Sequence, residues 1–126
     1  HVDPLGLLAM TSFFDSLYYL ITVKADKRVN LKDFRRQHGT RPLTFASPEE
    51  LLELLKLTPG SVTPLGLLAD KDHRVTFFLD RDFLLPPDRI GIHPNDNTAT
   101  IWFSAQGLVK LLQENGTTVE LAEISG

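Results

Sequence analysis

The sequence predicts an α+β domain with one mixed β-sheet, strongly curved or partly closed, and helices packed on it. Short apolar runs typical of buried strands, capped amphipathic segments typical of helices, and hairpin-length connections in the second half all favour it. At 126 residues the chain is long enough for one hydrophobic core but too short for two. We therefore expect a single domain over residues 1–126.

The first half of the chain is expected to alternate strands and helices. Residues 17–23 (LYYLITV) are apolar, aromatic and β-branched, which predicts a buried strand. Asn30 is expected to cap a helix running to about His38 and ending at Gly39, and residues 42–45 (PLTF) to form a brief strand. In SPEELLELLKL, a second helix is predicted by Ser47 as N-cap and Glu50 three residues later.

The second half predicts mainly hairpins. Residues 65–69 (LGLLA) and 74–80 (RVTFFLD) are expected to be two strands joined by the turn DKDH. RIGI and TATIWF repeat this pattern around HPNDN, and TVELAEI closes the chain as a strand. Between them, Ser104 is expected to cap a helix that ends at Asn115-Gly116. The predicted total is seven strands and three helices.

Composition narrows the class of protein. The chain has no cysteine, which excludes disulfides and thiolate chemistry and fits a reducing cytosol. No apolar run approaches the length of about 18 residues that a membrane span needs, and the first residues lack a secretory pattern. We therefore expect a cytoplasmic protein without a membrane partner. The chain begins at His1, so a fragment, a processed product and a renumbered chain all stay open.

The charge is unevenly distributed. The net charge of −3 argues against a general nucleic-acid coating protein. Between residues 24 and 41, however, only Asp26 and Asp33 oppose seven basic residues, a pattern that suits a specific anionic partner or a solvated helix face. The basic residues are Lys24, Lys27, Arg28, Lys32, Arg35, Arg36 and Arg41.

The hexapeptide PLGLLA occurs twice, at residues 4–9 and 64–69. A repeat protein would continue the likeness over tens of residues at a fixed period, whereas this likeness ends after six. The hexapeptide is therefore not a structural repeat.

Two loops carry the polar groups best suited to binding a ligand. In residues 58–64 (TPGSVTP), Gly60 between two prolines could aim backbone N–H groups, with the Ser61 and Thr63 hydroxyls, at an oxyanion or carboxylate. A rigid connection between helix and strand is the alternative. In IGIHPNDNTAT, hydrogen-bonding side chains converge as for a small polar ligand, the alternative being an Asx-type turn capped by His93. The four histidines show no metal-ligand spacing, so no metal is expected.

Taken in order, LTFASPEELLELLKLTPGSVTPLGLL, RVTFFLDRDFL and IHPNDNTATIWFSAQGLVKLL resemble the YbaK/prolyl-tRNA-synthetase editing-domain family, and within it the freestanding prolyl-tRNA deacylases. The likeness covers residues 17–124. It implies a mixed α/β fold and a trans-acting enzyme that hydrolyses mischarged prolyl-tRNA, most often alanine on the tRNA for proline, without metal or cofactor. The implied partners are the aminoacylated tRNA 3′ end and prolyl-tRNA synthetase.

The resemblance also implies roles for the two loops. Gly60, Ser61 and Thr63 would position the ester carbonyl or the attacking water as catalytic residues. His93 would shape the pocket and limit the size of the amino acid admitted. The basic residues Lys27, Arg28, Lys32, Arg35 and Arg36 become candidates for contact with tRNA phosphates. The substrate-binding residues implied are Val62, Pro64, His93, Pro94, Asn95, Asn97 and Thr98.

One residue pair departs from the family pattern. Family members carry a lysine-asparagine pair on an early strand, followed by an apolar run, and counting back from the apolar run places Asp3-Pro4 where that pair is expected. An aspartate cannot supply the ammonium group that holds the substrate. A catalytically silent member that binds tRNA or an aminoacyl-like ligand is therefore the alternative function, and a lysine upstream of His1 stays open.

Overall fold

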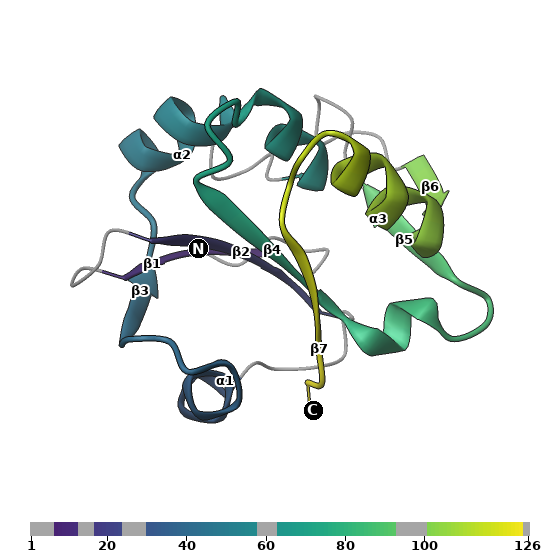
Figure 1. Ribbon diagram of the computed structural model, residues 1–126, viewed down its shortest axis with the longest axis horizontal. Helices are drawn as coiled ribbons and strands as arrows, with labels where there is room; N and C mark the ends of the chain where they lie inside the picture. Colours follow the sequence, from purple (N-terminus) through teal and green to yellow (C-terminus); the bar gives the residue numbers. More distant parts are fainter. Residues whose placement is uncertain (1–6, 13–16, 24–29, 58–62, 93–100, 125–126) are drawn as a thin grey trace.

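The computed structural model describes residues 7–12, 17–23, 30–57, 63–92 and 101–124 (Figure 1). The strands described are β1 Leu7–Ser12, β2 Tyr18–Thr22, β3 Leu43–Phe45, β4 Val75–Asp80, β5 Arg89–Ile92, β6 Ile101–Ser104 and β7 Val119–Ala122. The helices described are α1 Leu31–His38, α2 Pro48–Leu55 and α3 Ala105–Glu114, with the 3₁₀ helices η2 Pro64–Ala69 and η3 Arg81–Leu84.

Five strands form one mixed sheet in the order β3-β1-β2-β4-β7. β1 pairs antiparallel with both β2 and β3, whereas β4 pairs parallel with both β2 and β7. β5 and β6 form a separate antiparallel pair. The mixed sheet with flanking helices is confirmed, but the predicted partial closure is wrong. β3 and β7 lie at opposite edges of the five-stranded sheet and do not pair with each other, so the sheet stays open.

The sheet is buried on both faces because its central strands alternate apolar side chains to either side. Phe77 of β4 packs in one cluster with side chains of α2, η2 and α3, and Phe78 packs in the other with Phe34 of α1. Figure 1 shows α2, η2 and α3 on one side of the sheet and α1 on the other. We call these sides the α2–α3 face and the α1 face.

The predicted helix caps are confirmed. The Asn30 side-chain oxygen accepts backbone N–H groups of α1, and Gly39 ends that helix with a left-handed φ of 67°. Ser47 and Glu50 form a reciprocal capping box with hydrogen bonds of 3.1 and 2.9 Å. The Ser104 hydroxyl accepts the Gly107 N–H at 3.1 Å at the start of α3. Local side-chain chemistry therefore fixes where each α-helix begins.

The predicted strand at LGLLA, and its hairpin with β4, are wrong. This segment is the 3₁₀ helix η2, in which Pro64, Gly66 and Leu67 are buried, whereas Leu68 is 40% exposed. Pro64 at the first helical position and the Thr63 hydroxyl, which accepts the Leu65 N–H, favour a helical start. An apolar run this short fits a buried strand and a buried helix equally well, so the sequence pattern alone could not identify the helix.

The strand β1 was not expected from the sequence. All of its first four residues, Leu7 to Met10, are buried because it lies between β2 and β3 with both faces covered. A strand covered on both faces loses the apolar–polar alternation that identifies a surface strand. Seven strands were predicted and seven are described, but only because the missed strand β1 offsets the strand wrongly predicted at η2.

The structure contains no helix, within the residues it describes, that is long and apolar enough to cross a bilayer.

The two adjacent leucines of η2 give a test of its geometry. Leu67 is fully buried and Leu68 is 40% exposed. Leu67→Ala should lower the free energy of unfolding by about 2–5 kcal/mol because it opens a cavity in the core. Leu68→Ala should cost less than about 0.5 kcal/mol. Urea denaturation measures both, and equal losses would contradict the 3₁₀ register.

His38 at the end of α1 packs in an aromatic cluster on the α1 face. Its ring centroid lies 4.6 Å from that of Phe34 and 4.7 Å from that of Phe78. Burial lowers the pKa of His38 below its ordinary 6.5, with the Glu120 carboxylate acting weakly in the opposite direction. The unfolded chain therefore takes up this proton first as the pH falls, so the stability due to His38 is complete above pH 6.5 and decreases below it.

Replacing His38 by a ring that does not titrate tests this linkage. His38→Phe should flatten the dependence of the free energy of unfolding on pH between about pH 7 and pH 5. Denaturation midpoints of parent and variant across that range measure the difference, since the other histidines are common to both. Parallel pH profiles would contradict the assignment.

Candidate functional site

The structure describes some of the predicted site residues and leaves others outside its described ranges. Thr63 and Pro64 are described at the start of η2, and Lys32, Arg35 and Arg36 on α1. The predicted residues outside the described ranges are Lys27, Arg28, Gly60, Ser61, Val62, His93, Pro94, Asn95, Asn97 and Thr98, together with Asp3-Pro4.

The first motif loop is flanked by two buried residues, Leu57 and Thr63. Leu57 is 9% exposed and Thr63 2%, so both ends are fixed in the interior. Gly66 lies so close to α2 that a Cβ atom there would be 2.6 Å from Leu57 Cδ1 and 3.2 Å from the Leu55 carbonyl oxygen. The glycine thus allows η2 to pack directly on the end of α2, which holds the two ends of the loop together.

Thr63 has a structural role that sequence reasoning missed. Its hydroxyl oxygen accepts the backbone N–H of Leu65 at 3.3 Å and so caps η2. The pattern Thr-Pro before an apolar run is the signal that indicates such a cap. If the Thr63 hydroxyl takes part in the reaction, its oxygen must do so while it also accepts the Leu65 N–H.

The second motif loop leaves β5 and returns in β6. The hairpin is held to the start of α3 by Asp88, whose carboxylate accepts the Ser104 hydroxyl at 2.9 Å and the Gln106 N–H at 3.2 Å. The Asp88 carbonyl also accepts the Ala105 N–H at 3.1 Å. A carboxylate at a helix N-terminus is stabilised by the helix dipole. The base of the hairpin is therefore tied rigidly to α3.

Both loops are anchored on the α2–α3 face. Leu57 and Leu67 at the first loop belong to the same hydrophobic cluster as Ile90 of β5 and Leu108 of α3. Phe103 of β6 packs against this cluster. Two segments far apart in the sequence, each bearing one predicted motif, are therefore fixed to one core on one side of the sheet.

A buried aspartate closes the connection from η2 to β4. Asp70 is 5% exposed, and its two carboxylate oxygens accept the backbone N–H groups of Arg74 at 3.1 Å and Val75 at 2.8 Å. Sequence reasoning took this segment for an ordinary hairpin turn. Because both carboxylate oxygens are already hydrogen-bonded to the backbone, Asp70 serves the fold.

Tyr18, Glu50 and Arg74 form a second polar group at the edge of the same face. Burial raises the pKa of Tyr18, and a hydrogen bond with Glu50 raises it further. The Ser47 backbone N–H lowers the pKa of Glu50, and the Arg74 guanidinium lies 5.2 Å from the centre of the Tyr18 ring. Tyr18 therefore stays protonated and Glu50 ionised, which suits a structural contact better than a proton transfer.

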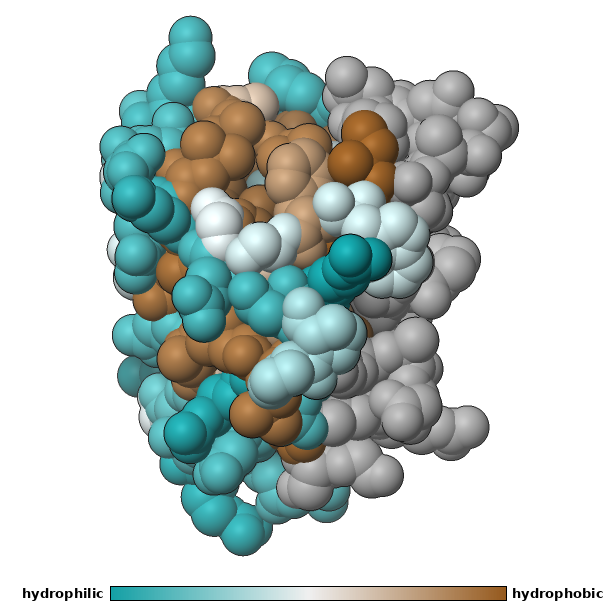
Figure 2. Space-filling view, turned by 90° about the vertical axis from the view of Figure 1, so that its right-hand side faces the viewer, coloured by the Kyte–Doolittle hydropathy of each residue, from teal (hydrophilic) through white to brown (hydrophobic). Residues whose placement is uncertain are grey.

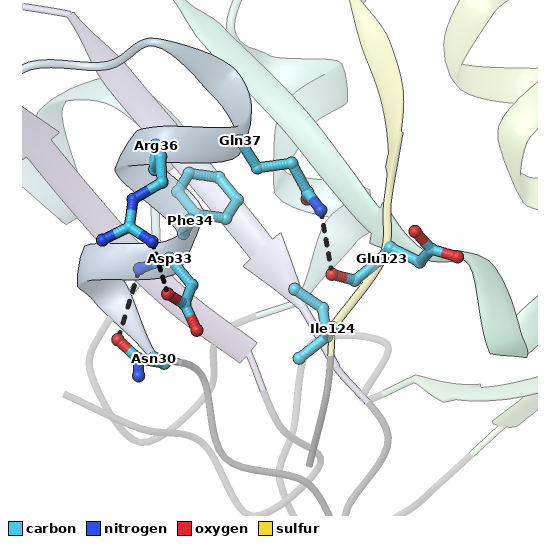
Figure 3. Close-up of a pocket in the computed structure, with 7 residues that line it drawn as sticks. All are labelled: Asn30, Asp33, Phe34, Arg36, Gln37, Glu123 and Ile124. Atoms are coloured by element: carbon cyan, nitrogen blue, oxygen red, sulfur yellow. Dashed lines mark hydrogen bonds and ion pairs between the residues drawn. The ribbon is translucent and has the colours of Figure 1, made fainter.

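The described basic candidates for tRNA contact lie on the opposite side of the sheet. Lys32 and Arg36 are exposed on α1, and the Arg36 side chain, 82% exposed, lies 3.9 Å from Asp33. Beside them is a depression of about 300 Å³ between α1 and the segment after β7 (Figure 3). The Gln37 amide crosses it to donate to the Glu123 carbonyl at 3.4 Å. The sheet therefore separates α1 from η2 and α3, which pack on the α2–α3 face.

Among the residues that the structure describes, no three histidine, aspartate or glutamate side chains gather into a set that could hold a metal ion.

An open mixed sheet, covered by helices on both faces and bearing two motif loops anchored on one of them, defines an α/β domain with a candidate binding site on that face. A sequence model of the family described as "Aminoacyl-tRNA editing domain" matches residues 8–111. The chain belongs to this aminoacyl-tRNA editing domain family. The resemblance seen in the two motifs is thus confirmed, with a match that begins after Asp3-Pro4.

Two curated relatives are equally similar to this chain in sequence. The chain is 36% identical over 107 residues to the prolyl-tRNA editing protein ProX of Acetoanaerobium sticklandii, covering 85% of this chain and 65% of that protein. It is 36% identical over 102 residues to prolyl-tRNA synthetase associated domain-containing protein 1 of Bos taurus, covering 79% of this chain and 59% of that one. The chain thus spans less than two thirds of the length of these relatives.

A solved structure supports the fold. The structure described as a candidate trans-editing enzyme for prolyl-tRNA synthetase superposes with a TM-score of 0.69 at 24% identity. The superposition covers 95% of this chain and 68% of that one. At this identity the likeness concerns the architecture alone.

Gly66→Ala tests the anchoring of the first motif loop. The new methyl group would press on Leu57 and on the Leu55 carbonyl, so the free energy of unfolding should fall by about 1–3 kcal/mol. The matched control is Gly107→Ala on α3, where a Cβ atom meets nothing closer than 3.6 Å. There alanine should stabilise by about 0.5–1 kcal/mol through helix propensity. Urea midpoints compare them, and a neutral Gly66→Ala would show that the contact does not constrain the loop.

Proposed function

We propose that this chain is an aminoacyl-tRNA deacylase that acts in trans on mischarged prolyl-tRNA, with alanine as the amino acid removed. The observation that carries the proposal is the anchoring of both motif loops to one core on one face of an editing-domain fold. The name of the relative ProX, a prolyl-tRNA editing protein, supports the choice of tRNA. Prolyl-tRNA synthetase as a partner and a cytoplasmic location belong to the same proposal.

In the proposed mechanism the first loop handles the ester and the second selects the amino acid. Backbone N–H groups around Gly60 and the Ser61 hydroxyl stabilise the negative charge that develops on the carbonyl oxygen and position the attacking water. His93 and the residues after it bound a small pocket that admits alanine and excludes proline by size. An activated ester needs only modest acceleration, so this scheme requires no nucleophilic triad.

The basic residues of the α1 region act in this proposal at a distance from the ester. Lys32, Arg35 and Arg36 lie on the α1 face, and Lys27 and Arg28 precede that helix. These basic side chains would contact phosphates of the tRNA backbone where the tRNA passes the edge of the domain. Such contacts add affinity without recognising the base sequence.

Asp3-Pro4 favours a second function, a catalytically silent member that binds tRNA or an aminoacyl-like ligand through the same loops. In this function the pocket binds its ligand but lacks the ammonium group that assists hydrolysis. The two functions differ in turnover and not in binding, so a rate measurement separates them.

The test is the rate of ester loss from the tRNA for proline charged separately with alanine, cysteine, serine and proline. The deacylase proposal expects rapid loss of alanine and retention of proline, because the pocket selects by size. The control is the variant with Asp3→Lys and Pro4→Asn. No loss from any ester, with activity gained in the variant, would favour the silent binder. Inactivity in both, together with no binding of the tRNA, would contradict both functions.

A further inference from the structure

Trp102 is a large aromatic side chain left in solvent beside the second motif loop. It is 62% exposed and is the single tryptophan of the chain. Successive side chains of a strand point to opposite sides. Since Phe103 packs against the core cluster, Trp102 points outward from the β5–β6 hairpin. In the sequence it follows the second motif loop, residues 93–100, by two positions.

The pairing of β5 with β6 leaves the Trp102 ring uncovered and places the Arg89 side chain near it. Trp102 pairs with Gly91, which has no side chain to lie across the ring. Arg89, two residues before Gly91, faces the same outward side and pairs with Ser104. It is therefore a diagonal neighbour of Trp102, at about 7–8 Å, which a long side chain spans.

The charges around this pair favour an anionic ligand. Arg89 is exposed, and no ion pair involves it within the described part of the chain. The neighbouring carboxylate of Asp88 is occupied by the Ser104 hydroxyl and the Gln106 N–H of α3. An exposed indole ring beside an exposed guanidinium is the combination by which proteins bind single-stranded nucleic acid.

Figure 2 shows this side of the molecule, formed by α3 and the hairpin, where apolar patches alternate with hydrophilic ones. Among the other exposed apolar side chains, Leu111 on α3 at 41% and Leu121 on β7 at 46% are aliphatic. They lack the flat π-face that stacks on a base. They therefore serve as matched controls for an aromatic function of Trp102.

We propose that Trp102 and Arg89 bind the single-stranded 3′ end of the tRNA, the ring stacking on a base and the guanidinium contacting a phosphate. The proposal rests on the proposed function for the identity of the RNA. Stacking tolerates any base, so the pair orients the end of the tRNA without selecting its sequence. Trp102 is thus a positioning residue, which holds the terminal nucleotides while the loops act on the ester.

The first experiment uses Trp102 as its own reporter, since all tryptophan fluorescence of the chain comes from this ring. The probes are the trinucleotide CCA and an acceptor-stem minihelix with and without its single-stranded CCA end. We expect saturable quenching by the two RNAs that carry the end and none by the blunt minihelix. Equal quenching by all three, or quenching that depends on protein concentration without RNA, would overturn the proposal.

The second experiment measures RNA binding by anisotropy of the labelled minihelix. Trp102→Ala should weaken binding about tenfold, whereas Trp102→Phe should retain most of it because a flat ring remains. Arg89→Ala should weaken binding and reduce its dependence on salt, by about one phosphate contact. The control Leu111→Ala should bind as the parent does, and a loss equal to that of Trp102→Ala would overturn the proposal.

Kinetics distinguish this proposal from the proposed function. With alanine on the full tRNA, Trp102→Ala should raise KM about tenfold and leave kcat nearly unchanged, as expected for lost positioning of the substrate. An alanine ester of a simple alcohol, which has no base to stack, should react equally with both proteins. Quenching by CCA without hydrolysis of any ester would refute the deacylase and leave the nucleotide site standing. Hydrolysis by the parent, with the same kinetics in Trp102→Ala and no quenching by CCA, would support the deacylase and refute the nucleotide site.

Discussion

The fold depends on burying the strand β4 on both of its faces. Phe77 and Leu79 are fully buried on the α2–α3 face, and Phe78 is 3% exposed on the α1 face. A strand that is apolar on both sides is stable only when helices cover the sheet from above and below. β4 also runs parallel to its two neighbours, so each connection to it must cross the sheet. Burial and strand direction together therefore set the positions of all three α-helices.

The two predicted motifs lie in the connections that join β4 to its parallel neighbours β2 and β7. The chain from β2 to β4 contains the first motif loop, and the chain from β4 to β7 contains the second. The first connection passes through α1 on one face and β3 at the sheet edge before α2 and η2 pack on the other face. α3 of the second connection shares that α2–α3 face with α2 and η2. The topology of the core thus joins two loops that are about thirty residues apart.

The repeated hexapeptide shows how far the sequence predicts this structure. Leu7–Ala9 of the first copy lies in β1, whereas the same Leu-Leu-Ala in the second copy, residues 67–69, ends the 3₁₀ helix η2. Helix starts at Asn30, Ser47 and Ser104 were predictable because a cap is a contact between residues three or fewer apart. The anchoring contacts of Gly66 and Asp88 were not, since their partners are set by tertiary packing and not by spacing.

In the proposed function, the two faces of the sheet contact different parts of the RNA. α1 and η2 lie on opposite sides, so two packing layers of about 10 Å each separate the basic helix from η2. In the proposed function, a phosphate bound by Arg36 therefore belongs to a different part of the RNA from the ester. The outward side of the β5–β6 hairpin has no such barrier, because its inward side packs in the cluster that anchors both loops. In the proposed function, contacts with the tRNA end come from the hairpin side, while α1 adds affinity that depends on salt.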